Sequence, residues 1–275
     1  MAFKKPDPLE EAGFTSTRET PRPLRIALST VGGEKSGKTH FAVMTMPDPL
    51  AIISLDTGAD EIVDKARAAG RVVYHHRILI PRFKVIADQK AQAAQRELYG
   101  PYWDKLRHSV DAIAAAKQIR SAVLDTFTEG YEVARLAYFG KLAQVKPQHY
   151  VEVNAETRNL VKGLYDERPD LNLALIHKVK KEYREGKSGE SNWTGRYEMA
   201  GFGDINYIVD LIIHHGYDIT ARRFTVTVPK VPGNCNCRFG DHVVGFELPG
   251  EANLPCDFPT LAMEAVPGSR YEDWT

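Results

Sequence analysis

Residues 32–39 read Gly-Gly-Glu-Lys-Ser-Gly-Lys-Thr, which matches the pattern G-x-x-x-x-G-K-[ST] without a gap. This pattern is typical of a phosphate-binding loop, because its glycines let the backbone wrap closely and several N–H groups point at one phosphate chain. Lys38 is then expected to reach the β- and γ-phosphates, and Thr39 to ligate Mg²⁺. The predicted cofactors are ATP and Mg²⁺, held by Gly32, Gly33, Glu34, Lys35, Ser36, Gly37, Lys38, Thr39 and His40.

The flanks of this loop have the character that the motif requires. The apolar residues 24–31 predict a strand before it, and residues 39–44 predict a helix after it, whose N-terminal dipole favours an anion. Pro47 and Pro49 must end that helix within about three turns.

A second chemical position is the aspartate that ends the apolar run 121–124. Asp125 is expected at the carboxyl end of a strand, where α/β sheets bind ligands, and there it would hold the Mg²⁺ shell through water. The alternative is that Asp125 only caps the following helix.

Hydrolysis also needs a group that orients or deprotonates a water molecule. Asp56 ends the apolar run 50–55, Asp60 and Glu61 follow it by about one helical turn, and Glu129 lies four residues beyond Asp125. Capping of a helix explains Asp56 equally well, and pairing with a helix dipole explains Asp60 and Glu61. The sequence does not choose among these carboxylates.

The apolar run 171–177 ends in a histidine. If this strand lies beside the P-loop strand, His177 would point near the γ-phosphate and report its presence. The alternative is a histidine that merely ends a strand at the surface.

Residues 178–204 predict a long loop without regular structure. Between 178 and 187 there are five bases and two acids, a net charge of +3, with Tyr183 and Trp193 interleaved in the longer segment. Bases and aromatic rings together favour single-stranded nucleic acid, although a solvated surface loop has similar composition. The predicted DNA-binding residues are Lys178, Lys180, Lys181, Arg184 and Lys187, and Arg196 is expected to reach a neighbouring subunit and act in trans.

Composition narrows the class of protein. The 275 residues contain 43% hydrophobic residues and equal numbers of Lys+Arg and Asp+Glu, 36 each, which argues against a strongly cationic nucleic-acid binder. No apolar run approaches the ~20 residues of a membrane span, and the N-terminus lacks the apolar region of a secretory signal. The cysteines, Cys235, Cys237 and Cys256, suit a reducing cytoplasm and lack the second pair of a zinc site.

The order of apolar runs predicts an α/β fold with a mostly parallel central sheet flanked by helices. Expected strands are 24–31, 50–55, 71–80, 121–124, 171–177 and 207–213, and expected helices are 59–69, 88–99, 103–118, 129–143 and 154–166. A small antiparallel hairpin from 223–228 and 242–248 is expected on the sheet edge. The predicted division is an arm at 1–23, a core at 24–221, and a β extension with an irregular tail at 222–275.

Taken in order, these features resemble those of RecA-like, core-only P-loop ATPases common in bacteriophages, some of which act as single-strand annealing recombinases. The similarity covers residues 24–217. It implies a RecA-like P-loop NTPase core, with Lys38 and Thr39 on phosphate and Mg²⁺, Asp125 on the metal, and His177 as γ-phosphate sensor. It also implies a DNA-contacting loop after His177, a homo-oligomer in a ring or filament, a single-strand binding protein as partner, and the bacterial host cytoplasm.

One position departs from the family. RecA-like proteins carry a catalytic glutamate two residues beyond the aspartate of the second strand, and this chain has Gly58 there. The leading hypothesis is an ATP-dependent, oligomeric DNA recombination or annealing protein. Two alternatives stay open: a nucleotide or small-molecule kinase whose lid uses Arg184 and Arg196, and a module that binds nucleotide without hydrolysing it.

Overall fold

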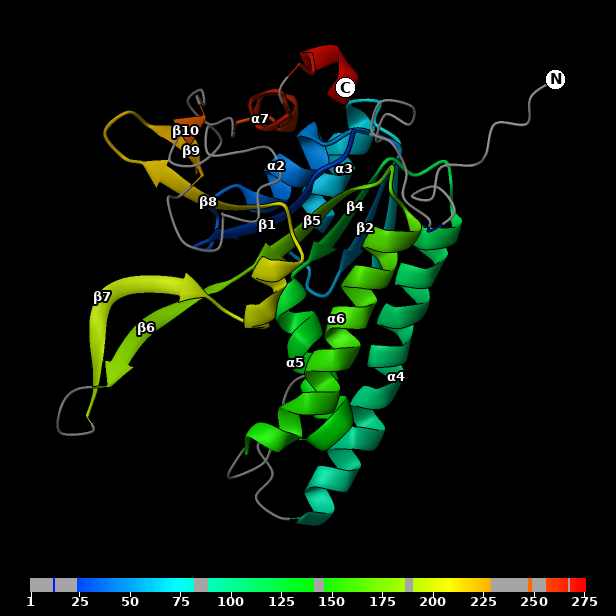
Figure 1. Cartoon of the computed structure of the whole chain (residues 1–275), viewed down its shortest axis with the longest axis vertical. Coiled ribbons are helices and arrows are strands. Elements are labelled where there is room, and N and C mark those ends of the chain that lie inside the picture. The colour runs from blue at the N-terminus through cyan, green and yellow to red at the C-terminus, as the bar shows by residue number, and fades with distance from the viewer. Residues whose placement is uncertain are drawn as a thin grey trace.

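The computed structural model describes residue 12 and residues 24–81, 89–140, 146–185, 190–228, 247–248, 256–266 and 268–275. Its centre is an eight-stranded sheet in the order β10-β9-β8-β1-β5-β4-β2-β3 (Figure 1). The strands from β8 to β3 are parallel, β9 pairs antiparallel with β8, and β10 pairs antiparallel with β9. The sheet strands are β1 (Ala27–Gly32), β2 (Leu50–Ser54), β3 (Val73–Arg77), β4 (Ser121–Asp125), β5 (Asn172–His177), β8 (Leu211–Asp218), β9 (Arg223–Thr227) and β10 (Glu247–Leu248).

Helices cover both faces of this sheet. On one face lie α2 (Lys38–Thr45), α3 (Asp60–Ala68) and α7 (Phe258–Ala265), and on the other α4 (Gln89–Ala115), α5 (Phe127–Phe139) and α6 (Tyr150–Glu167) (Figure 1). Short 3₁₀ turns are η1 (Pro147–His149), η2 (Gly203–Tyr207) and η5 (Tyr271–Trp274). The predicted α/β class, with a mostly parallel sheet and a small C-terminal antiparallel pair, is confirmed.

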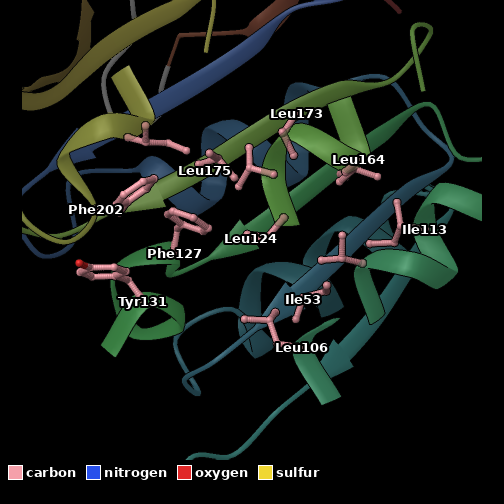
Figure 2. Close-up of a cluster of buried hydrophobic side chains, with 14 of the residues drawn as sticks. Ile53, Leu106, Ile113, Leu124, Phe127, Tyr131, Leu164, Leu173, Leu175 and Phe202 are labelled. Carbon is pink, nitrogen blue, oxygen red and sulfur yellow. The ribbon is translucent and has the colours of Figure 1, made fainter. Parts of the chain in front are cut away.

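Strand residues alternate between two apolar cores. In β5, Ala174 and Ile176 pack toward α2 and α7, whereas Leu173 and Leu175 pack toward α5 and α6, as Figure 2 shows for the second core. Each fully buried leucine or isoleucine stabilises the fold by roughly 1.5–3 kcal/mol. Because both faces are covered, the central strands are the short apolar runs that the sequence contains.

One prediction about the helices is wrong. Residues 88–99 and 103–118 were expected as separate helices, but α4 runs through Pro101 without a break. Tyr99, Trp103, Leu106 and Val110 are all buried and recur at helical spacing, and the last three pack in the second core. That shared burial outweighs the roughly 3 kcal/mol that an interior proline costs.

Two further expectations need correction in the segment that follows β5. Residues 178–204 are not a structureless loop, because β6 (Val179–Glu185) and β7 (Ser191–Met199) pair as an antiparallel hairpin that projects from the body (Figure 1). The strand expected at 207–213 begins only at Leu211, since Ile205 and Val209 enter the second core in and beside η2. We call the β6–β7 hairpin the arm, and from here on this name does not refer to residues 1–23.

The C-terminal residues contain more structure than the expected irregular tail. Helix α7 packs its buried face against the first core, and Trp274 in η5 is buried there as well. The N-terminal segment predicted at 1–23 lies outside the described residues except for Ala12. The division at residue 222 stays a prediction. Among the helices that the structure describes, none combines the length and apolar character that crossing a bilayer requires.

Candidate functional site

The predicted phosphate loop lies between β1 and α2. Gly37 has φ of 90°, a left-handed conformation that glycine adopts without strain. At Gly32 a Cβ atom would lie 2.6 Å from Ser36 Oγ and 2.7 Å from the His215 carbonyl oxygen, so a side chain does not fit. Helix α2 begins without a side-chain cap and without an acidic residue in its first turn, which leaves its first N–H groups to an anion.

The Lys38 side chain folds back over this loop. Its ammonium group donates to the carbonyl oxygens of Gly32 at 2.9 Å and Gly33 at 2.6 Å. Burial lowers the pKa of Lys38, and the charge of Asp125 opposes that change. A cation is thus held directly beside the backbone donors of the loop.

Asp125 ends β4 next to the start of α2. The Thr39 hydroxyl donates to Asp125 Oδ2 at 2.7 Å. Burial raises the pKa of Asp125 to about 6, against the effects of the Thr39 hydrogen bond and of Lys38 and Lys178. A carboxylate and a hydroxyl are the hard oxygen donors that Mg²⁺ prefers, so this pair fits the predicted metal.

These groups open into one cleft of about 650 Å³, a volume typical of ligand sites. All nine predicted nucleotide-binding residues, from Gly32 to His40, line it. The other lining residues are Asp56, Gly58, Ile62, Asp125, Thr126, Lys178, Val179 and Phe224.

The candidate water-orienting carboxylates are spread over different places. Asp56 lines the cleft, and its Oδ1 accepts the Gly58 N–H at 2.9 Å. Asp60 and Glu61 do not line it: Asp60 pairs with Arg77, and Glu61 pairs with Lys65 at 2.6 Å. A Cβ at Gly58 would lie 3.2 Å from Asp56 Oδ1, so a side chain at position 58 would crowd this aspartate.

Glu129 lies in the first turn of α5 and forms an ion pair with Lys178. It lines a separate hollow of about 510 Å³ beside the base of the arm rather than the phosphate cleft. The Lys178 side chain, by contrast, reaches the cleft.

His177 does not line the cleft. Its side chain is fully buried on the α5 face, with its ring 5.5 Å from that of Phe127 and its Nδ1 3.3 Å from the Ala200 carbonyl oxygen. Burial lowers the pKa of His177 to about 4, so this imidazole is neutral. The cleft lies on the α2 face, and strand alternation directs residue 177 to the opposite side.

His215 is a buried neighbour of the phosphate loop that the sequence did not single out. It pairs with Gly32 in the β1–β8 register, and its ring lies 5.2 Å from Phe41. Neither ring nitrogen has a hydrogen-bond partner within the described residues, and burial lowers its pKa to about 3. The adjacent pair His214–His215 is visible in the sequence, but only the order of strands places it beside the loop.

The arm collects aromatic and basic side chains on one face. Lys181 lies over the Trp193 ring at 5.1 Å, and the Trp193 and Tyr197 rings are 6.4 Å apart. Tyr183 is the cross-strand partner of Trp193. All three rings are at least half exposed, and the sequence prediction had missed Tyr197.

Carboxylates offset part of the positive charge of the arm. Lys180 pairs with Glu198 at 3.3 Å, and Arg184 pairs with Glu182 at 3.2 Å. Arg196 is exposed on β7, where its carbonyl oxygen accepts the Trp193 indole N–H. Lys187, Cys235 and Cys237 lie outside the described residues, and Cys256 is buried in the first core.

No protein-family model matches this chain, and no curated protein matches its sequence. Among solved structures it is similar to the RadB recombinase, with 10% identity and a TM-score of 0.38 over 75% of this chain and 81% of that one. It is also similar to a prototypical ATPase of the type III secretion system of pathogenic bacteria, with 12% identity and a TM-score of 0.38 over 70% of this chain and 51% of that one. The sheet order and the loop between β1 and α2 define an α/β protein with a P-loop-type turn at the carboxyl end of its central strand.

Proposed function

We propose that this protein binds and hydrolyses ATP with Mg²⁺ and acts on single-stranded DNA in recombination or strand annealing. The observation that carries the nucleotide part is the convergence of the phosphate loop, Lys38 and the Thr39–Asp125 pair on one cleft. The loop donors and Lys38 would bind the phosphates, and Thr39 and Asp125 would hold the metal. Mg²⁺, when bound, neutralises charge on the β- and γ-phosphates.

Two cleft residues extend this assignment beyond the phosphates. Asp56 replaces Asp60, Glu61 and Glu129 as the carboxylate proposed to orient water, since only Asp56 of these four lines the cleft. Phe224 lies on β9, two strands from β1, and lines the same cleft. A flat apolar ring there suits a nucleobase and offers no polar group to select among bases.

The arm supports the DNA part of the proposal. Exposed rings with a lysine beside them are suited to stack bases and to neutralise the phosphates of a single strand. Assembly into an oligomer, with Arg196 acting in trans, belongs to the same proposal, as does the phage-type annealing role that the sequence resemblance implies.

One observation favours the second candidate, a nucleotide-binding module without turnover. Residue 58, where RecA-like proteins carry a catalytic glutamate, is a glycine. Any side chain there would crowd Asp56. If Asp56 does not activate water, the cleft retains its ligands for nucleotide but lacks a means of hydrolysis.

The deciding experiment measures ATP hydrolysis and ATP binding with and without single-stranded DNA. We expect DNA to stimulate hydrolysis by the wild type, Lys38→Ala to lose nucleotide binding with its fold retained, and Asp56→Asn to bind ATP but turn over at least about 100-fold more slowly. Tight ATP binding without turnover under any condition would favour the switch module. Phosphoryl transfer to a nucleoside monophosphate, unaffected by DNA, would favour a kinase.

A further inference from the structure

Lys178 is the residue at which the nucleotide cleft meets the arm. It directly follows the fully buried His177, the last residue of β5. Lys178 nevertheless lines the phosphate cleft, and its ammonium group lies beside Glu129 in the first turn of α5. Its charge contributes to the electrostatics of both Lys38 and Asp125, which places it within range of the triphosphate site.

In this structure the Lys178 ammonium is paired with Glu129. About half of the lysine side chain stays exposed, and Glu129 belongs to the neighbouring hollow rather than to the cleft. Lys178 thus borders both a carboxylate and the predicted phosphate site. Because solvent reaches the lysine end of this pair and screens it, a more highly charged anion can replace Glu129.

Hydrogen bonds hold the backbone of Lys178 in place, whereas its side chain is held by the partly exposed ion pair. The Thr128 hydroxyl accepts the Lys178 N–H at 3.0 Å and donates to the Ala200 carbonyl oxygen at 3.0 Å. The Ala200 N–H in turn donates to the Lys178 carbonyl oxygen at 2.9 Å. One hydroxyl, three residues beyond Asp125, therefore ties both ends of the arm to the start of α5.

We propose that Lys178 is a second phosphate-binding cation, which exchanges its partner Glu129 for the terminal phosphate when ATP binds. This exchange links the arm to the state of the nucleotide. The proposal rests on the nucleotide function above and reassigns Lys178 from DNA contact to nucleotide contact. A terminal phosphate carries more charge than a carboxylate and accepts charge-assisted hydrogen bonds, whereas ADP offers no group at that position. The Lys178–Glu129 pair then breaks with ATP and persists with ADP.

The test compares the affinities for ADP and for a non-hydrolysable ATP analogue, each with Mg²⁺, by titration calorimetry. We expect Lys178→Gln to weaken analogue binding about tenfold while ADP binding changes less than about twofold, and Lys178→Arg to restore most of the loss. Glu129→Gln should strengthen analogue binding up to about fivefold, and this gain should vanish in the double variant with Lys178→Gln. Lys162→Gln is the matched control, because Lys162 is similarly exposed and paired with Asp166 but lies on α6.

A second readout follows the arm. In the wild type, the analogue and ADP should give different affinities for a fluorescent single-stranded oligonucleotide, and Lys178→Gln should abolish that difference. Equal losses for ADP and analogue, or an unchanged preference in Lys178→Gln, would overturn the inference and leave the proposed function intact. Failure of the wild type to bind either nucleotide would instead overturn the proposed function, and this inference with it.

Discussion

At the residue scale, burial makes ionisation of Asp125 unfavourable, and a metal site would explain why an aspartate stands there. A carboxylate with a pKa of about 6 is destabilised by its own burial when it ionises. A bound divalent cation would remove that cost, because it favours the ionised form. The residue is thus poorly matched to the protein without ligand and well matched to a site that holds Mg²⁺.

The first prediction uses this mismatch. The pKa of Asp125 rises from an ordinary value of 3.8 to about 6 on folding, so the unfolded chain releases its proton first and stability is lost as pH rises through this interval. Asp125→Asn cannot ionise, and we expect it to raise the free energy of unfolding without ligand at pH 7.5 by on the order of 1–3 kcal/mol.

Chemical denaturation at pH 7.5 and at pH 4 measures this difference, and the gain should be absent at the lower pH. The same variant should lose Mg²⁺-dependent nucleotide binding, because the ionised oxygen is gone. Equal stability of the two proteins at pH 7.5 would contradict the raised pKa.

The positions that the sequence predicted well belong to short, continuous motifs, although the roles of these residues stay predictions. The P-loop and Asp125 each follow a short apolar strand, and both lie in the cleft. The sequence did not predict that His177 is buried away from the cleft, that Lys178 lines it, or that His215 lies beside the loop, because these places depend on which strand lies beside which and on the face that each residue takes. Neither is a local property of the chain.

At the element scale, the arm shows how composition misleads. Its charges and glycines suggested a loop, but Tyr183, Trp193 and Tyr197 form strands well and pair across the hairpin. A glycine in β7 with φ of 81° and the register shift after Lys181 make the pairing irregular, which hides the alternation from a reading of the sequence. Helix α4 is the converse case, since its burial pattern outweighs the proline that predicted a break.

The second prediction concerns the exposed face of the arm. If bases stack on Trp193, Trp193→Ala should weaken binding of single-stranded DNA by about 1–3 kcal/mol, roughly 5- to 150-fold in Kd. Fluorescence anisotropy with an oligonucleotide measures this. Tyr74→Ala is the control, because Tyr74 is 52% exposed, as Trp193 is 50% exposed, but lies on β3 at the far edge of the sheet.

Lys181→Gln should reduce the dependence of log Kd on log salt, because one phosphate contact is lost. Trp193→Ala should leave that slope unchanged, since stacking releases no counterions. If Tyr74→Ala and Trp193→Ala weaken binding equally, the arm is not the DNA site.

At the scale of the whole molecule, the chain returns from its far end to support the nucleotide cleft. The Phe258 N–H donates to Thr45 Oγ1 at 2.8 Å, at the end of the helix that begins at Lys38. The Phe258 ring lies 6.4 Å from Phe41 and 6.0 Å from Trp274, so α7 and η5 form the outer wall of the first core. The sequence did not predict this, because α7 is short and follows a stretch rich in proline and glycine.

The last prediction tests that support. Phe258→Leu keeps an apolar side chain but leaves part of the space beside Phe41 unfilled, and we expect the free energy of unfolding to fall by about 1–1.5 kcal/mol. Nucleotide binds only the folded protein, so ATP should raise the unfolding temperature of both wild type and variant. Because α2 presents Lys38 and the loop donors, the looser packing behind it should also weaken ATP binding, and the ATP-induced rise should be smaller in the variant. Thermal unfolding with and without Mg²⁺-ATP measures both effects.

Met263→Ala is the control, since Met263 lies on α7 but is 37% exposed and should change neither quantity. An equal ATP-induced rise in wild type and Phe258→Leu would mean that α7 stabilises the fold without acting on the phosphate loop.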